Sequence, residues 1–173
     1  MKILEIRRHS IRSSQSERLD STGVTLARLV GQNIGPFDRV ATSTLSRALE
    51  TAVAMGFAVD EQNEALIPFG REVENEVSWL TPFAGYPAIL RKQGAAFKLA
   101  NQLVEYYASM MNYISEGRSA LVVAHGGVVE LSVTGCLPAF DFSAWDEPVS
   151  YCEGARLYWD DKFIRAEELR VKL

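Results

Sequence analysis

The chain has 173 residues, of which 47% are hydrophobic and 23% charged, and this composition indicates a folded domain and excludes a disordered chain. The length is typical of one domain, so residues 1–173 are expected to form a single domain. The formal net charge of -4 argues against nucleic acid and anionic membrane as partners, because both bind basic surfaces.

The two cysteines, Cys136 and Cys152, form no metal-binding or redox spacing with each other or with the two histidines. We interpret both as reduced, structural residues. The opening residues MKILEIRRHS contain no apolar run long enough for a signal peptide. No stretch reaches the ~18 apolar residues of a membrane span, so the expected compartment is the cytoplasm.

The first third of the chain alternates strand and helix patterns. Apolar residues recur at every second position in the strand segments and on one face of the helical segments. Glycine and small polar residues supply the stop and start signals. The predicted elements are a strand at 2–7, a helix at 21–34 capped by Ser21 or Thr22, a strand at 37–43 and a helix at 43–57 that stops at Gly56.

Residues 57–96 are less regular and contain three of the six prolines. We expect a variable insertion with short helical pieces in this segment. Its aromatic residues Trp79, Phe83 and Tyr86 are suited either to a lid that excludes water or to a satellite of the core, and the core is slightly favoured.

The second half repeats the alternation and then ends in a hairpin. A continuous apolar strand such as SALVVAH is typical of a parallel sheet that is covered on both faces. The whole pattern predicts an α/β fold with three layers, α/β/α, a mainly parallel sheet and an antiparallel edge hairpin at the C-terminus. The predicted elements are a helix at 95–114, a strand at 119–125, a helix at 126–137 and a hairpin at 153–169.

Both histidines follow predicted strands, where the loops of a parallel sheet form binding sites. His9 follows Arg8 at the end of the first strand, and His125 precedes Gly126 at the end of the 119–125 strand. Arg47 lies in the first turn of the helix after the second strand. Any one of these residues is ordinary at a turn or surface. Together, the arginines and helix N-termini predict a site for a dense anion such as phosphate.

Three motifs in order resemble the histidine phosphatase superfamily, which includes the cofactor-dependent phosphoglycerate mutases. The family's Arg-His-Gly stands here as Arg8-His9-Ser10. Its Ser-x-Leu-x-Arg-Ala stretch stands at 43–48, followed by Thr51 and Ala52. Its apolar strand ending in His-Gly stands at 122–126. The resemblance spans the chain apart from about 57–96.

The resemblance implies a metal-independent phosphatase, a phosphomonoesterase or phosphoamidase, in which His9 takes the phosphoryl group. It implies that Arg8, Arg47 and His125 bind this group, with Ser10 and Gly126 beside them, and that no metal or cofactor takes part. A neutral imidazole is a competent nucleophile near pH 7. The implied substrate is a small phosphorylated metabolite or a phosphohistidine protein.

The chain departs from the family pattern at two places. Ser10 replaces a glycine, and its hydroxyl is able either to donate to phosphate or to crowd it. The family's general acid falls in the stretch EALIPFGREVENEV, where Glu72 and Glu74 are the candidates, although both equally fit solvated loop residues. These departures leave a non-catalytic phosphate-binding module as the alternative, and a phosphoglycerate mutase is disfavoured by the short loops. Arg12, Ser14 and Arg18 are candidates for the mouth of the site.

Overall fold

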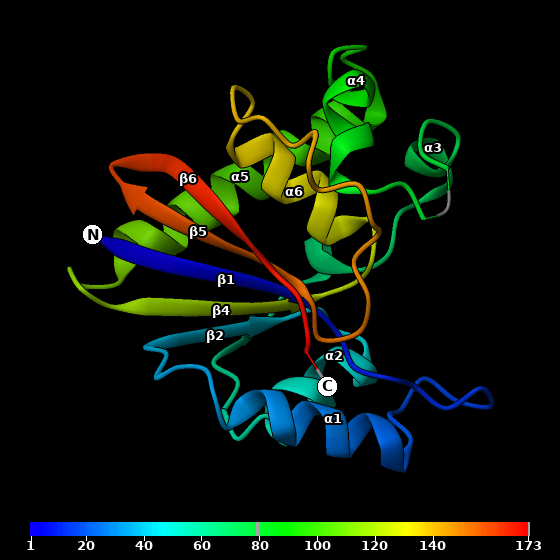
Figure 1. The fold of residues 1–173 in the computed structure, drawn as a ribbon, viewed down its shortest axis with the longest axis vertical. Coiled ribbons are helices and arrows are strands. Elements are labelled where there is room, and N and C mark those ends of the chain that lie inside the picture. The colour runs from blue at the N-terminus through cyan, green and yellow to red at the C-terminus, as the bar shows by residue number, and fades with distance from the viewer. Residues whose placement is uncertain (79, 173) are drawn as a thin grey trace.

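The fold is given by a computed structural model that describes residues 1–78 and 80–172. Its strands and helices alternate up to α2 and again from α5 to β5 (Figure 1). In chain order the elements are β1 (Lys2–Arg8), α1 (Ser21–Gly31), β2 (Arg39–Thr42), α2 (Ser46–Ala54), β3 (Glu61–Gln62), the 3-10 helix η1 (Glu64–Leu66), α3 (Arg71–Glu74), the 3-10 helix η2 (Phe83–Gly85), α4 (Tyr86–Leu90), α5 (Ala95–Tyr113), β4 (Ser119–Ala124), α6 (Val128–Cys136), β5 (Gly154–Asp160) and β6 (Lys162–Leu169).

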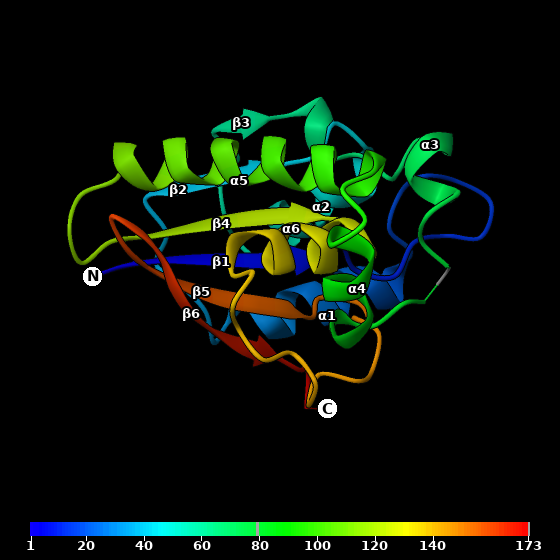
Figure 2. The same cartoon turned by 90° about the horizontal axis from the view of Figure 1, so that it is seen from above.

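One mixed sheet forms the middle layer, with the strand order β3-β2-β4-β1-β5-β6. The pairs β1–β4, β2–β4 and β2–β3 are parallel, whereas β5 pairs antiparallel with both β1 and β6. Helices α1 and α2 cover one face, and α4, α5 and α6 lie on the other (Figures 1 and 2). This arrangement confirms the predicted three-layer α/β fold with its antiparallel C-terminal edge.

Strand β4 is buried on both faces, as its unbroken apolar sequence predicts. Ala120, Val122 and Ala124 belong to the core under α5 and α6. Leu121 and Val123 face the opposite way and pack in the core under α1 and α2. This central position between β2 and β1 fixes the place where the strand ends and His125 begins.

The helices of the first half differ from their predicted bounds at the ends. Asp20 caps α1 in place of the predicted Ser21 or Thr22, because its Oδ1 accepts from the Gly23 N–H at 2.7 Å. Helix α2 ends before Gly56, which has a φ of +96° and follows the C-cap as predicted.

The segment 57–96 contains several short elements, and one of them was not predicted. Strand β3 has two residues, too few for a periodic signal, and it pairs with β2 through Ala41 and Glu61. Phe83 and Tyr86 are fully buried, which confirms them as core residues. Trp79, grouped with them in the prediction, lies outside the described residues.

Cys136 and Cys152 are buried and free, as the prediction of structural thiols requires. Within 1–78 and 80–172, no helix combines the length and hydropathy needed to cross a bilayer.

Candidate active site

The carboxyl ends of β1, β2 and β4 bring the two histidines together. The His9 N–H donates to the carbonyl of Ala124 at 2.9 Å, which continues the β1–β4 ladder for one residue beyond the strand. The imidazole rings of His9 and His125 lie 5.1 Å apart between centroids, and both residues are at most 5% exposed. The parallel strands thus place both side chains at one edge of the sheet.

The hydrogen bonds of His9 define its tautomer. Its Nδ1 lies 2.6 Å from the carbonyl oxygen of Ser10, which only accepts, so Nδ1 carries the proton. The Nε–H of Arg47 donates to His9 Nε2 at 3.2 Å. The imidazole is therefore neutral, and its Nε2 lone pair faces a guanidinium.

His125 is oriented by Ser43, the residue after β2. The Ser43 Oγ accepts from the Leu45 N–H at 3.3 Å and lies 2.7 Å from His125 Nε2. With its oxygen engaged by this N–H, the hydroxyl is suited to donate a hydrogen bond to Nε2, which places the single proton of the neutral imidazole on Nδ1. His125 Nδ1 is buried and has no hydrogen-bond partner in the described structure.

Arg8 is held beside the histidines by the chain before β5. Its Nη1 donates to the carbonyl of Val149 at 2.8 Å, and its guanidinium lies 4.6 Å from the ring centroid of Tyr151. The ring of Tyr151 also lies 5.9 Å from that of His9. Arg8 Nε, like His125 Nδ1, is buried without a partner among the described residues.

Three arginines give the site its positive charge. Burial lowers the pKa of Arg47, and the neighbouring charges of Arg12 and Arg8 lower it further. The one carboxylate that contacts Arg47 among the described residues is Glu17, which lies on the loop between β1 and α1. Glu17 also lies 3.8 Å from Arg12. The guanidinium that faces His9 is thus ion-paired with an exposed carboxylate from a loop.

Ser10 faces away from the two histidines. Its hydroxyl donates to the carbonyl of Gly23 in α1 at 2.7 Å, and its N–H donates to the Thr51 hydroxyl at 2.8 Å. Thr51 in turn donates to the carbonyl of Arg47 at 2.6 Å. Ser10 and Thr51 therefore tie the end of β1 to the two helices below it, and the Ser10 hydroxyl is directed at α1.

Burial and positive charge keep both imidazoles neutral. Burial, followed by the charges of Arg47, Arg8 and Arg12, lowers the pKa of His9 to about 4, although the Ser10 carbonyl opposes this. The pKa of His125 is lowered to about 2, mainly by burial and then by its interactions with His9, Arg47 and Arg8. Near neutral pH the site presents two neutral imidazoles among cations.

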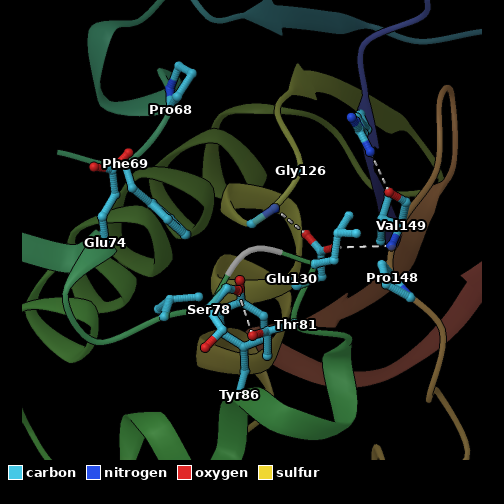
Figure 3. Close-up of a pocket in the computed structure, with 14 residues that line it drawn as sticks. Pro68, Phe69, Glu74, Ser78, Thr81, Tyr86, Gly126, Glu130, Pro148 and Val149 are labelled. Carbon is cyan, nitrogen blue, oxygen red and sulfur yellow. Dashed lines mark hydrogen bonds between the residues drawn. The ribbon is translucent and has the colours of Figure 1, made fainter. Parts of the chain in front are cut away.

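A cavity of about 270 Å³ opens beside Arg8 and Gly126. Of the two predicted acids, Glu74 lines this cavity, whereas Glu72 on the same turn of α3 is absent from its described lining (Figure 3). Gly126 fits closely, since a Cβ there would lie 3.4 Å from the Arg8 guanidinium.

The backbone at the start of α6 binds the carboxylate of Glu130, a residue of the same helix. The sequence predicts that helix N-termini help to bind a dense anion. The Gly127 N–H instead donates to Glu130 Oε2 at 2.6 Å, and the Val149 N–H donates to Glu130 Oε1 at 3.1 Å. Glu130 is 2% exposed, so the N-terminus of α6 is neutralised from within the chain.

No group of three or more His, Cys, Asp or Glu side chains in the described ranges is arranged to hold a metal ion.

The sequence matches no family model and no curated protein. The structure, in contrast, superposes on solved phosphatases over nearly the whole chain. The phosphoserine phosphatase of Entamoeba histolytica has a TM-score of 0.70 at 18% identity, with 99% of this chain and 98% of that chain covered. A mycobacterial glucosyl-3-phosphoglycerate phosphatase, solved with VO3, has a TM-score of 0.71 at 16% identity, with 99% and 100% covered.

The protein histidine phosphatase SixA, solved with tungstate, has a TM-score of 0.61 at 18% identity, with 96% of each chain covered. The chain has the histidine phosphatase fold. The three sequence motifs of the resemblance lie at the carboxyl ends of β1, β2 and β4.

Sequence reasoning missed several residues that contact the site. Ser43 stands inside a quoted motif, so its place after a strand was a usable signal. Tyr151 and Glu17 come from loops whose approach to the site depends on tertiary structure. Of the three residues suggested for the mouth, Arg12 acts on His9 and Arg47 by its charge, and Arg18 pairs with Glu50 on α2 at 2.6 Å. Ser14 is exposed on the same loop.

Proposed function

We propose that this protein is a metal-independent phosphatase in which His9 receives the phosphoryl group of a phosphomonoester or phosphoramidate. Arg8, Arg47 and His125 bind that group, and Gly126 gives it space beside Arg8. No cofactor takes part in this scheme.

One observation carries the proposal. Among the described residues, two buried side-chain polar atoms lack a hydrogen-bond partner, and these are Arg8 Nε and His125 Nδ1. A buried donor without a partner costs about 1–3 kcal/mol, so such groups mark places where a ligand completes the bonding. The His125 ring lies 5.1 Å from that of His9, the charge of Arg8 lowers the pKa of His9, and both N–H groups suit the oxygens of a phosphoryl group.

The proposed reaction has two displacements at phosphorus. The lone pair of His9 Nε2 attacks, an N–P bond forms, and the bond from phosphorus to the leaving oxygen or nitrogen breaks while that atom gains a proton. Water then attacks the phosphorus of the phosphohistidine, an O–P bond forms and the N–P bond breaks. The proton of the water passes to the group that donated one in the first step, inorganic phosphate leaves, and the neutral imidazole is restored. Fixed guanidinium charge stabilises the equatorial oxygens in both steps.

Among the predicted acids, the proposal assigns the proton donor to Glu74. Glu74 lines the cavity beside Arg8, where a leaving group would lie, whereas Glu72 is absent from the described lining. Glu130 also lines the cavity, but each of its carboxyl oxygens already accepts a backbone N–H.

Ser10 and the unplaced general acid are the two grounds for the alternative of a non-catalytic phosphate-binding module, and the structure bears on the first. The Ser10 hydroxyl donates a hydrogen bond to the Gly23 carbonyl. The serine that replaces the family's glycine therefore adds no group toward His9. This removes the steric argument against catalysis at His9, and the catalytic proposal takes precedence over a binding module.

The test is to capture the intermediate. The protein is mixed with a labelled phosphoryl donor such as acetyl phosphate and quenched in alkali, and we expect an acid-labile phosphate on His9. His9→Asn should lose both the label and turnover of 4-nitrophenyl phosphate. Label on a serine or aspartate, or turnover that survives His9→Asn, would contradict the proposal.

A further inference from the structure

The cavity lies beside the chain neighbours of the two histidines. Arg8 and Gly126, which adjoin His9 and His125 in the sequence, line it and form what we call its phosphate end, although neither histidine is in its described lining. Figure 3 shows Glu74 and Phe69 together on one side of it, and Glu130 and Val149 on another. A phosphoryl group held by Arg8 and His9 would therefore direct its leaving group into this space.

One cation and two acids line the cavity, and burial raises the pKa of one of these acids, Glu130. Arg8 is the one cation in the described lining, and its Nη1 is already bonded to the Val149 carbonyl. Glu74 and Glu130 are both acids, and they come from α3 and α6. Glu130 is fixed by two backbone N–H groups and supplies no positive charge in either protonation state. A leaving group that carries a carboxylate would meet no cation beyond the phosphate end.

The remaining lining suits a compact group with an apolar body. At about 270 Å³ the cavity is at the small end for ligand sites. Half-buried Phe69 offers aromatic surface, and cations bind favourably to such rings, while the buried Tyr86 closes the wall behind it. The Ser78 and Thr81 side chains add hydroxyl groups near Tyr86 (Figure 3).

We propose that this cavity is the leaving-group pocket and that it selects compact substrates bearing a cationic amine over those bearing a carboxylate. The inference rests on the proposed phosphatase function and specifies its substrate class. The neighbouring folds include phosphatases named for phosphoserine, which carries both an amine and a carboxylate, and for glucosyl-3-phosphoglycerate, which carries a carboxylate. The described lining of this cavity has no lysine and no second arginine to receive one.

The test uses three aryl phosphates that differ in charge and little in leaving-group chemistry. They are the phosphate esters of tyramine, which is cationic, of 4-ethylphenol, which is neutral, and of 3-(4-hydroxyphenyl)propionic acid, which is anionic. We expect kcat/KM to fall in that order, with the tyramine ester favoured over the propionate ester by at least about tenfold. Equal values, or a preference for the anionic ester, would overturn the inference.

Two glutamates two residues apart provide a matched pair of variants. Glu74→Lys should remove or invert the preference for the tyramine ester, and Glu74→Gln should weaken it. Glu72→Lys makes the same charge change on the same short helix outside the described lining, and it should leave the preference close to wild type. Both positions are exposed, so neither variant threatens the fold. An equal effect of Glu72→Lys and Glu74→Lys would contradict a pocket contact.

Failure of the inference is distinguishable from failure of the proposed function. Turnover of 4-nitrophenyl phosphate that depends on His9 tests the function alone. If that turnover is present and the charge order is absent, the function stands and the pocket assignment fails. If there is no turnover, the same three esters are compared by the rise in melting temperature that each produces. An order other than cationic, neutral, anionic then overturns the pocket assignment as well.

Discussion

The phosphate side of the site and the leaving-group side are built differently. His9 and Ser43 each donate a backbone N–H to β4, at 2.9 and 3.1 Å, so the sheet itself sets their positions. The opposite side comes from the four-residue helix α3, the loop before η2 and the start of α4. Under the proposed function, the chemistry would thus belong to the ends of long-range parallel strands, and selectivity to short local elements. Changes on the first side should abolish turnover, and changes on the second should alter which substrates turn over.

The largest effect is expected from His125→Ala. Loss of the Nδ1–H donor should lower kcat on 4-nitrophenyl phosphate by about 10²–10³-fold, as for other donors that stabilise a transition state. Ser43→Ala, which leaves the imidazole but removes its orienting hydroxyl, should give a smaller loss. Circular dichroism checks that both variants fold. A folded His125→Ala variant with more than a tenth of wild-type kcat would place His125 outside the phosphate site.

Glu74→Gln should separate substrates by their leaving groups. A general acid contributes about 10²–10⁴-fold when the leaving group is poor, so turnover of alkyl phosphates should fall by at least about 10²-fold. Turnover of 4-nitrophenyl phosphate should stay near wild type, because nitrophenolate leaves without a proton.

Glu72→Gln is the control for this experiment and should spare both substrates. If both glutamine variants keep full activity on alkyl phosphates, then α3 supplies no proton donor.

The pH dependence of stability should report both neutral imidazoles. The pKa of His9 is lowered to about 4 and that of His125 to about 2, against about 6.5 in the unfolded chain. The unfolded chain therefore binds more protons below pH 6.5, so the free energy of unfolding should fall as the pH drops from 6.5 to 5. Each histidine contributes up to about 1.4 kcal/mol per pH unit in this window, and the contribution is constant above it.

Urea denaturation at pH 5.0, 6.0 and 7.5 measures this slope. His9→Asn removes one of the two histidines, so the histidine part of its slope should be about half that of wild type. The carboxylates contribute equally to the slopes of both proteins. The imidazole proton resonances of the two histidines should not titrate between pH 5 and 8. A midpoint near 6.5 for His9 would show that its ring is solvated.

The smallest effect is expected at Glu17. Its carboxylate pairs with Arg47 from an exposed loop, and it competes with any anion that Arg47 binds. Arg47 is buried but Glu17 is solvent-exposed, and an ion pair with an exposed partner is worth about 0–1 kcal/mol, so Glu17→Gln should tighten phosphate binding by at most about fivefold. Calorimetric titration with inorganic phosphate measures this change, and Arg47→Ala should lose most of the binding. Weaker phosphate binding in Glu17→Gln would show that Glu17 supports the site.

The sequence alone determined the central sheet and the residues at its parallel strand ends. The apolar run of β4, the alternation of β1 and the C-terminal hairpin carry strong periodic signals, and strand ends in such sheets meet at one edge. The positions of His9, Arg47 and His125 along the chain were therefore enough to group them in one site. Strand β3, with two residues, carries no such signal and forms because β2 offers it an edge.

The tertiary structure decided the directions of side chains and the partners brought by loops. The sequence left Ser10 either donating to phosphate or crowding it, and its hydroxyl instead bonds to α1. It left Glu72 and Glu74 equivalent, and of the two only Glu74 lines the described cavity. Glu17 reaches Arg47 through a loop without a repeating pattern. Periodicity encodes which face of an element is buried, but the direction of a single polar side chain depends on atoms that are distant in the sequence.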